Sequence, residues 1–379
     1  MPTATAADQR VYNFSAGPAV LPVPVLEQAR DEMLCLPGVG ASILEISHRS
    51  AAFMAIIEAA EANIRKLLGV PDDYAVLFLQ GGGRLQFWMT AANLIGELGA
   101  FKGKSADYLL TGTWGKQAMA EAKKVAPVRV AYDSSATNFD RLPAPFCKGE
   151  AAMDLDPNAA YVHYTCNETI QGVQFATEPE TNGVPLVCDA SSDFLHKKLD
   201  ISKYGLLYAC AQKNAGPAGV TIVIVNKALV ANASPSLPIY CNYNTHIAEN
   251  SLNNTAPTFS IYIVKLVTDW LLSEFGDLDA VYQQNQLKAK MLYDVMDAAP
   301  EFYIGHAKPE CRSLMNVAFR LPSEELTDAF LSGAKKRNLT DLKGHRSVGG
   351  ARASIYNAMP VEGVECLRDY MLEFQNAKG

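Results

Sequence analysis

Residues 206–225 read LLYACAQKNAGPAGVTIVIV, in which a single lysine stands between two apolar runs. The first run, Leu206 to Ala211, and the second, Val220 to Val225, have the length and the apolar character of buried strands. The residues between them are small and include Gly216-Pro217, which is typical of a turn. We therefore predict a strand, a turn and a second strand, with Lys213 at the carboxyl end of the first strand.

The position of Lys213 suggests a catalytic role. Ligands of open α/β sheets bind at the carboxyl ends of the strands. A lysine held there against apolar neighbours can act as an amine nucleophile. The simpler alternative is an exposed lysine in a polar turn, as most lysines are. The apolar runs on both sides of Lys213 favour the nucleophile.

The composition limits the kind of protein. Hydrophobic residues make up 49% of the 379 residues and charged residues 19%, which is typical of a folded globular chain. This length favours two domains. The formal net charge is −7 and the chain has no basic tract, so we expect no nucleic-acid partner. The six histidines form no metal-binding motif, so we expect no metal site.

The cellular location is also constrained. Met1 to Arg10 lack the basic start and the apolar core of a signal peptide, and no apolar run is long enough to cross a membrane. The eight cysteines include no CxxC pair and show no disulfide-framework spacing. We therefore expect reduced thiols, a cytoplasmic location and no membrane partner.

Strand and helix patterns alternate between Tyr74 and Val225. Because the predicted strands are apolar on both faces, we expect a mostly parallel sheet covered by helices, which is an α/β fold. Loops are predicted at 81–84 and 112–115, each before a helix. The seven predicted strands are 75–79, 107–110, 128–132, 160–164, 186–189, 206–211 and 220–225.

The remaining segments are assigned to connections and to a smaller α+β domain. Residues 240–257 are polar and rich in asparagine, which favours a long functional loop over a helix. Residues 42–49 are predicted to be extended at first and to end in a cationic corner, His48-Arg49. The predicted domains are a large one at 17–260 and a small one at 1–16 with 261–379.

Four further features follow predicted strands, as Lys213 does. Gly81-Gly82-Gly83 lets backbone N–H groups approach a phosphate at a helix N-terminus, although a flexible connection has the same composition. Asp189 ends a strand, either as a helix cap or as the partner of a cationic ring nitrogen. Trp114 either fills the core or offers a flat surface to an aromatic ligand. Thr169 either donates a hydroxyl or shapes a turn.

Positive side chains gather near the C-terminal end of the sequence. Residues 343–352 read KGHRSVGGAR, and Asp341 is the one acidic residue close to them in sequence. Arg352 begins a predicted apolar strand, where an unpaired charge is costly. A solvated loop is the simpler explanation. An anionic ligand would instead pair the charges, since arginine binds carboxylate and phosphate with two hydrogen bonds.

Taken in order, these segments resemble the phosphoserine aminotransferase family, within the fold-type I superfamily of pyridoxal-phosphate enzymes. The resemblance runs from Asn13 to about Phe374. The sequence departs from the family pattern at Leu85, where glycine is common, and at Thr165-Cys166 and Ala215, without loss of a catalytic group. The most specific segments are 13–19 (NFSAGPA), 47–49 (SHR), 81–84 (GGGR), 167–169 (NET), 211–214 (AQKN), 257–259 (PTF) and 343–346 (KGHR).

The resemblance implies pyridoxal 5'-phosphate as the cofactor. Lys213 would carry it as a Schiff base and would move the proton between the substrate Cα and the cofactor C4′. Asp189 would pair with the pyridinium nitrogen and keep the ring an electron sink. Trp114 would stack on the ring, and Thr169 would form a hydrogen bond near its hydroxyl.

The resemblance also implies a homodimer with shared active sites. The backbone N–H groups of Gly83 and Arg84, with Gln212, would hold the cofactor phosphate. Asn254 and Thr255 would reach the cofactor phosphate of the other subunit.

The substrate-binding residues follow from the same resemblance. Arg352 would clamp the substrate α-carboxylate. The second anionic group of the substrate would lie among His345, Arg346 and, from the other subunit, His48, Arg49 and Arg84. The implied reaction moves an amino group reversibly between L-glutamate and 3-phosphohydroxypyruvate, with ping-pong kinetics. A phosphorylated hydroxy-oxobutanoate is a further substrate that the family suggests.

Three alternatives stay open. Cysteine desulfurases resemble one another in a histidine before the lysine, where this chain has Gln212. An alanine-type transaminase would not need the His345-Arg346 pair. The third alternative is not an enzyme but a non-catalytic phosphate-ligand binding protein, which would use Gly81 to Arg84. This hypothesis leaves Lys213 unexplained.

Overall fold

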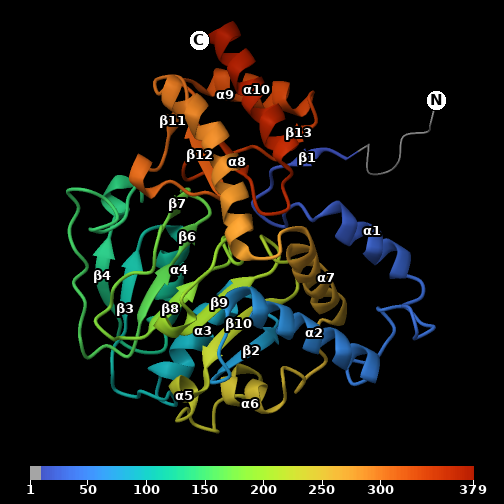
Figure 1. The fold of residues 1–379 in the computed structure, drawn as a ribbon. Helices are drawn as coiled ribbons and strands as arrows, with labels where there is room; N and C mark the ends of the chain where they lie inside the picture. The colour runs from blue at the N-terminus through green and yellow to red at the C-terminus, as the bar shows by residue number, and fades with distance from the viewer. Residues whose placement is uncertain (1–9) are drawn as a thin grey trace.

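The computed structural model describes residues 10–379, which are organised around one large sheet (Figure 1). Its strands are β2 (Tyr74–Leu79), β3 (Asp107–Leu110), β4 (Arg129–Asp133), β5 (Val162–Thr165), β8 (Leu186–Asp189), β9 (Tyr204–Cys210) and β10 (Thr221–Asn226). They lie in the order β2-β10-β9-β8-β5-β3-β4. β10 runs antiparallel to both of its neighbours, and the other neighbouring pairs are parallel. The predicted seven-stranded, mostly parallel sheet is confirmed.

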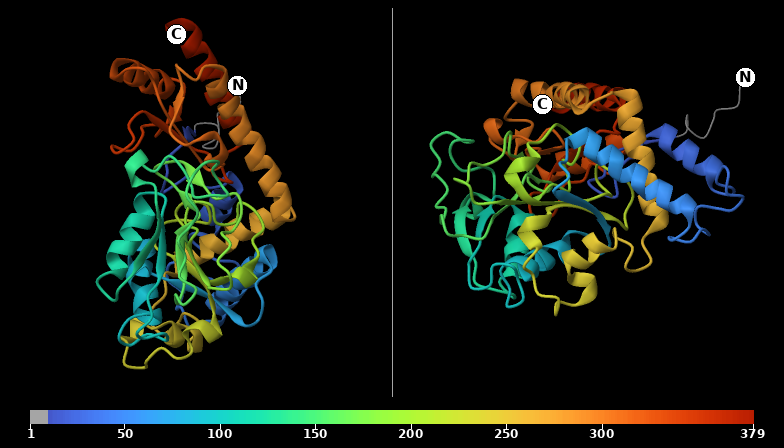
Figure 2. Two further views of the ribbon diagram at one scale, coloured as in Figure 1. Left: turned by 90° about the vertical axis from the view of Figure 1, so that its left-hand side faces the viewer. Right: turned by 60° about the horizontal axis from the view of Figure 1, so that its bottom comes forward.

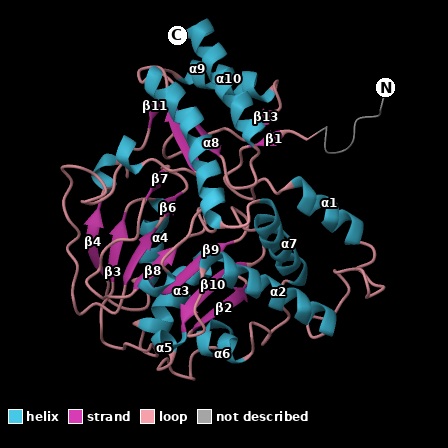
Figure 3. Ribbon diagram, viewed as in Figure 1, coloured by secondary structure: helices cyan, strands magenta, loops and turns pink. Residues whose placement is uncertain are grey.

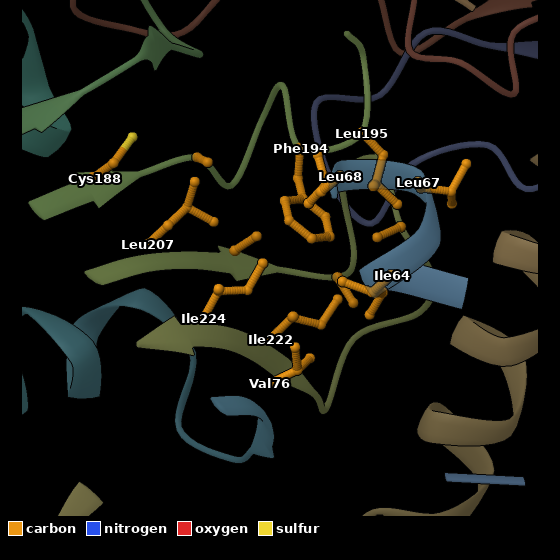
Figure 4. Close-up of a cluster of buried hydrophobic side chains, with 14 of the residues drawn as sticks. Ile64, Leu67, Leu68, Val76, Cys188, Phe194, Leu195, Leu207, Ile222 and Ile224 are labelled. Carbon is orange, nitrogen blue, oxygen red and sulfur yellow. The ribbon is translucent and has the colours of Figure 1, made fainter. Parts of the chain in front are cut away.

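Both faces of this sheet are buried. In β2, Val76 and Phe78 belong to the hydrophobic cluster on one face, whereas Leu77 and Leu79 belong to the cluster on the other. This division follows from the two-residue period of a strand. Figure 4 shows the first cluster, where side chains of β2, β8, β9 and β10 meet those of α2 (Ala51–Leu68). Burial of both faces explains why these strands are continuous apolar runs.

Helices cover the two faces of the sheet (Figure 3). On the face of Val76, α2 packs against α7, and α1 packs against α7 in turn. The opposite face is covered mainly by α3 and α4, with α5 and α6 near one edge. The bounds are α1 Val23–Glu32, α3 Gly82–Leu94, α4 Thr113–Ala122, α5 Lys227–Val230, α6 Tyr243–Ala248 and α7 Thr258–Glu274.

A smaller region is stacked on one end of the large sheet (Figure 2). Its three-stranded antiparallel sheet has β12 in the middle, and Phe14 from the N-terminal segment packs in its core. The short strands β1 and β13 pair in parallel and tie that segment to this region. The elements are β1 Tyr12–Asn13, α8 Leu278–Ala298, β11 Ile304–Gly305, β12 Asn316–Arg320, α9 Glu324–Lys335, β13 Leu339–Thr340, β14 Ala351–Ser354 and α10 Val361–Lys378.

Short elements complete the fold. The hairpin of β6 and β7 lies between the large sheet and the smaller region (Figure 1). The division into domains at 17–260 and at 1–16 with 261–379 remains a prediction, and residues 1–9 of it lie outside the described residues. The short elements are β6 Asn167–Glu168, β7 Val173–Gln174, η1 Ser135–Thr137, η2 Ile201–Lys203, η3 Ile239–Cys241 and η4 Pro309–Cys311.

Two predicted connections differ from the structure. The loop predicted at 240–257 is wrong in part, because α6 lies within it. The Asn242 side chain accepts the N–H of Asn244 and caps this short helix, a role that asparagine performs well. Residues 42–49 form successive turns instead of an extended segment. The Ser42 hydroxyl accepts the N–H of Leu44, and such local bonds compete with strand structure.

The eight cysteines all lie among the described residues and are free thiols. Within residues 10–379, none of the helices is both long and apolar enough to cross a membrane.

A buried lysine stabilises the smaller region. The side chain of Lys288, in the middle of α8, has no exposed surface. Its Nζ donates to the carbonyl oxygens of Ile355, Tyr356 and Met359 at 3.1, 2.7 and 3.1 Å. These carbonyls belong to the turn between β14 and α10, so Lys288 joins α8 to that turn.

We predict that Lys288→Met lowers the free energy of unfolding by about 3 kcal/mol, because it leaves three buried carbonyl groups without their donor. Unfolding in urea, followed by circular dichroism, measures this loss. The matched control is Lys290→Met on the same helix. The Lys290 side chain is 70% exposed and pairs with Asp294, so its replacement should cost at most about 0.5 kcal/mol. Equal losses in both variants would contradict the stabilising role of Lys288.

Candidate active site

Lys213 lies where the sequence predicts it, on the turn that follows β9. Its Nζ donates to Oγ1 of Thr169 at 2.7 Å and lies 5.4 Å from the centroid of the Trp114 ring. The next residue, Asn214, is buried and donates to the carbonyl of Phe194 at 2.7 Å, which anchors the turn. A primary amine is thus held at the carboxyl edge of the sheet, between a hydroxyl and an aromatic ring.

Asp189 ends β8, the strand next to β9. Its side chain is buried, and Oδ1 accepts the N–H of Ser191 at 3.0 Å. Burial raises the pKa of this carboxyl, whereas the Lys213 charge lowers it. A buried carboxylate is stabilised by a cationic partner, so Asp189 is suited to a protonated ring nitrogen as well as to its local turn.

The Gly-rich turn leads directly into a helix. α3 begins at Gly82, so the predicted loop at 81–84 is wrong in its second part. Gly81 has a φ of +90°, and a Cβ placed on it would lie 2.6 Å from the Leu85 side chain. Leu85 therefore fits because Gly81 has no side chain. The N–H of Gly83 donates to Sγ of Cys210 at 2.9 Å. A glycine-rich helix N-terminus of this kind is suited to a phosphate.

The second predicted loop, at 112–115, is also wrong in part. α4 begins at Thr113, so Trp114 lies in the first turn of a helix. Gly112 and Gly115 leave space there for the side chain of Glu168, which is fully buried. The position of Trp114 is therefore set by contacts with the β6–β7 hairpin, and not by a mobile connection.

Positive charge converges on the same place from the smaller region. Arg352 lies on β14, and its Nε is buried with no hydrogen-bond partner among the described residues. Burial lowers the pKa of this guanidinium, and burial with the charges of Arg352 and Arg346 lowers the pKa of His345. Burial is the first cause of both shifts and disfavours the charged forms, which a bound anion would favour.

These side chains line one cavity of about 810 Å³. Its size is within the range of ligand sites, about 300–1,000 Å³. It includes Ala16 and Gly17 from the N-terminal segment and Ser347 from the loop after His345. The predicted site residues that the structure brings together here are Gly83, Arg84, Trp114, Thr169, Asp189, Gln212, Lys213, His345, Arg346 and Arg352.

Four predicted residues lie outside this cavity. His48 and Arg49 are in the turns before α2, where the Nε of Arg49 is 3.2 Å from Nε2 of His48. The Asn254 side chain donates to Oε1 of Gln80 at 2.8 Å, and Thr255 is exposed. A single chain therefore does not bring His48, Arg49, Asn254 and Thr255 to the cavity.

The structure also adds residues that the sequence interpretation missed. Cys210 and Ser191 line the cavity, and the Ser191 hydroxyl accepts the N–H of Cys210 at 3.1 Å. Glu168 lies behind Trp114. Cys210 is in the stretch that contains Lys213, and Glu168 precedes Thr169, so closeness in sequence was an available signal. Their contacts are made with residues far away in the chain, which sequence patterns do not reveal.

The cavity fits a planar ligand that carries a phosphate. Three buried polar atoms of its lining residues have no partner among the described residues: Trp114 Nε1, Gln117 Oε1 and Arg352 Nε. Buried polar groups are nearly always paired, so these atoms indicate a polar ligand. Trp114 supplies an aromatic face, and the start of α3 supplies backbone N–H groups.

The sheet order and the lysine at its carboxyl edge agree with the predicted class, the fold-type I aminotransferases. The family model for aminotransferase class-V matches residues 11–367, and the chain belongs to this family.

Individual relatives narrow the comparison. The chain is 53% identical over 369 residues to phosphoserine aminotransferase of Rhodopirellula baltica. The aligned region covers 97% of this chain and 95% of that protein. It is similar to the solved structure of phosphoserine aminotransferase from Bacillus circulans subsp. alkalophilus, with a TM-score of 0.92, 45% identity, and coverage of 98% and 100%. A structure of PLP-bound phosphoserine aminotransferase from Trichomonas vaginalis has a TM-score of 0.87 and 38% identity, with coverage of 96% and 100%.

We predict that Gly81→Ala destabilises the protein through both its backbone and its contact with Leu85. The positive φ costs an alanine about 1–2 kcal/mol, and the clash with Leu85 adds about 2 kcal/mol. Unfolding in urea gives the total.

The matched control for this prediction is Gly103→Ala. Gly103 has a φ of +87° with nothing within 4 Å of an added Cβ, so it reports the backbone cost alone. Adding Leu85→Ala to Gly81→Ala should recover part of the difference between the two glycine variants. If Gly81→Ala costs no more than Gly103→Ala, the packing of Leu85 on Gly81 is not a constraint.

Proposed function

We propose that this chain is a pyridoxal-phosphate-dependent transaminase. It transfers an amino group reversibly between L-glutamate and 3-phosphohydroxypyruvate, giving 2-oxoglutarate and O-phospho-L-serine. The observation that carries the proposal is the convergence of Lys213 and Asp189 with the cationic residues His345, Arg346 and Arg352 in one cavity. Substrates with two separated anionic groups match that arrangement, and the relatives named above support the assignment.

The proposed cofactor residues are those that the family resemblance implies, and their presence in one cavity supports the assignment. Lys213 would hold pyridoxal 5'-phosphate through Nζ, and Asp189 would pair with its ring nitrogen. Trp114 would pack on the ring, and Thr169 would form a hydrogen bond near its hydroxyl. The backbone N–H groups of Gly83 and Arg84, with Gln212, would hold the phosphate at the start of α3, where the Gly83 N–H would exchange its bond to Cys210 Sγ for one to the phosphate.

When bound, the cofactor supplies an electron sink that stabilises negative charge at the substrate Cα. Asp189 supports this role because its buried carboxylate favours a protonated ring nitrogen. Lys213 moves the proton at the substrate Cα through Nζ. Thr169 orients that amine, since its hydroxyl oxygen accepts from Nζ at 2.7 Å. Substrate and product use one site in turn, which implies ping-pong kinetics.

The two anionic ends of the substrate are held by different cations. Arg352 would take the α-carboxylate, and its half-buried guanidinium, with no partner at Nε among the described residues, is suited to an anion. His345 and Arg346, with Arg84 of the partner subunit, would take the distal phosphate or the side-chain carboxylate of glutamate. The salt bridges of the described residues involve other arginines, such as Arg65 and Arg141, so these cations are free for a ligand.

The active unit is proposed to be a homodimer. His48 and Arg49 lie outside the cavity of their own chain and would complete that of the partner, together with the Arg84 side chain. Asn254 and Thr255 would reach the partner's cofactor phosphate. The segment before His48 supports this arrangement, because Leu34 is 88% and Leu44 60% exposed, as expected of side chains that a second subunit covers. A cytoplasmic location is proposed with it.

We predict that O-phosphoserine removes the visible absorption of the cofactor-loaded protein and that serine hardly does so. Amino transfer from O-phosphoserine to the cofactor changes its absorption, and the cationic residues require the phosphate. A spectrophotometric titration with the two amino acids measures this. Lys213→Ala is the control, and it should lack both the lysine-linked absorption and turnover.

The other outcomes of this titration are distinct. Equal loss of absorption with both amino acids would support the cofactor assignment but refute the assigned substrate. A protein that stays colourless with pyridoxal phosphate would refute the transaminase and favour the non-catalytic phosphate-binding alternative.

We predict that mixing two inactive variants, Lys213→Ala and Arg49→Ala, restores activity after subunit exchange. In a mixed dimer, the chain with intact Lys213 receives Arg49 from its partner, so one site is complete. Steady-state amino transfer after exchange in mild denaturant measures the recovery.

The control for the mixing experiment is Lys213→Ala with Asp189→Ala. Both of these residues line the cavity of their own chain, so no mixed dimer has a complete site. If neither mixture recovers activity, each site uses Arg49 of its own chain, and the proposed sharing of Arg49 is refuted.

A further inference from the structure

Glu168 is a buried carboxylate for which the proposed reaction has no role. Its side chain has no exposed surface. Its two oxygens accept the N–H of Trp114 at 3.0 Å and the N–H of Gly115 at 2.8 Å. These donors belong to the first turn of α4, whose N-cap residue, Gly112, provides no side-chain bond. A carboxylate from a distant part of the chain thus performs the capping, with a favourable interaction with the helix dipole.

The first turn of α4 has space for this carboxylate and for little else. A Cβ on Gly112 would lie 2.1 Å from Cδ of Glu168, and a Cβ on Gly115 would lie 3.3 Å from Oε1. The φ of Gly112 is −179°, which any residue can adopt, so the glycine is required for space and not for its backbone conformation. The contact between Glu168 and α4 therefore depends on both glycines.

The turn that carries Glu168 also holds Lys213. Thr169, the next residue, accepts from Nζ of Lys213, while the Gln171 side chain donates to the Thr113 hydroxyl at 2.8 Å. The Trp114 ring lies 5.4 Å from the same Nζ. Two adjacent residues, Glu168 and Thr169, thus bond to the backbone of Trp114 and to the amine of Lys213, which lie close together in the cavity.

We propose that Glu168 is a positioning residue, which holds the Trp114 indole in place for the cofactor ring through the backbone N–H groups of Trp114 and Gly115. The inference rests on the proposed function for its ligand, although the position of the indole can be measured without any ligand. It assigns to Glu168 a role in binding the ring and none in binding the phosphate.

The surroundings of Glu168 act on its carboxyl group in opposite directions. Burial raises the pKa of Glu168 to about 7, while the N–H groups of Gly115 and Trp114 lower it, the Asp189 charge raises it and the Lys213 charge lowers it. The two N–H bonds require acceptor oxygens on both sides. A glutamine in its place would present an NH₂ group to one of the two N–H donors and lose that bond.

The test uses Glu168→Gln in a chain whose other tryptophans are replaced, Trp88→Phe and Trp270→Phe, so that fluorescence reports Trp114 alone. In the cofactor-free protein we expect the Trp114 emission to move to longer wavelength. The Kd for pyridoxal phosphate, measured by absorbance, should rise about tenfold. The Kd for inorganic phosphate, measured by calorimetry, should not change, because the α3 cradle is intact.

The matched control is Glu150→Gln in the same background. Glu150 is a carboxylate with 17% side-chain exposure that pairs with Arg141 and Lys308, away from the cavity. This variant should leave the emission and both Kd values as they are in the parent. The proposal is overturned if Glu168→Gln changes neither the emission nor the Kd for pyridoxal phosphate. It is also overturned if both variants change these quantities equally.

A second variant tests the same contact if Glu168→Gln does not fold. Gly115→Ala places a Cβ 3.3 Å from Oε1 of Glu168 and 3.1 Å from the backbone oxygen of Leu109, without changing any charge. It should shift the emission in the same direction and raise the Kd for pyridoxal phosphate by a smaller factor, and no shift would again overturn the proposal. If the parent protein does not bind pyridoxal phosphate, the proposed function fails, and the emission of the cofactor-free variants still decides the role of Glu168.

Discussion

The burial of both faces of the seven-stranded sheet is the constraint on which the rest of the structure depends. A polar side chain on either face needs a buried partner, as His163 has in the Tyr208 hydroxyl at 2.9 Å, so most polar groups gather where the strands end. Asp189 and Lys213 follow neighbouring strands, and the first turns of α3 and α4 start at the same edge. The cavity lies at this edge, where several polar side chains from neighbouring strands and helices meet.

The smaller region completes the cavity and is held to the large sheet through the β6–β7 hairpin. The Asn167 side chain donates to the Asn316 side chain at 2.8 Å, and the N–H of Ser313 donates to the Gly172 carbonyl at 2.9 Å. Asn316 begins β12, which pairs with the strand of Arg352. The hairpin that contacts Trp114 and Lys213 therefore also sets the place of the proposed carboxylate-binding arginine.

Local patterns predicted much of this arrangement and failed at identifiable points. The strands were predictable because burial on both faces makes them continuous apolar runs. Trp114 was expected in a loop, because glycines at 112 and 115 resemble a connection, yet they make space for Glu168. That contact spans 54 residues of sequence, so no local pattern indicates it. The asparagines of residues 240–257 similarly favoured a loop, although one of them, Asn242, caps α6.

The sequence by itself determined the order of strands and helices, the turn that presents Lys213 and the excess of positive charge near Arg352. These depend on hydrophobic periodicity, turn residues and charge, which are local properties of the chain. Only the tertiary structure decided that Arg352 and Lys213 line one cavity, that Cys210 accepts from Gly83, and that His48 and Arg49 lie outside it. These relations arise from the packing of segments far apart in sequence, whose mutual distances are set by the buried sheet and the hairpin between the two regions.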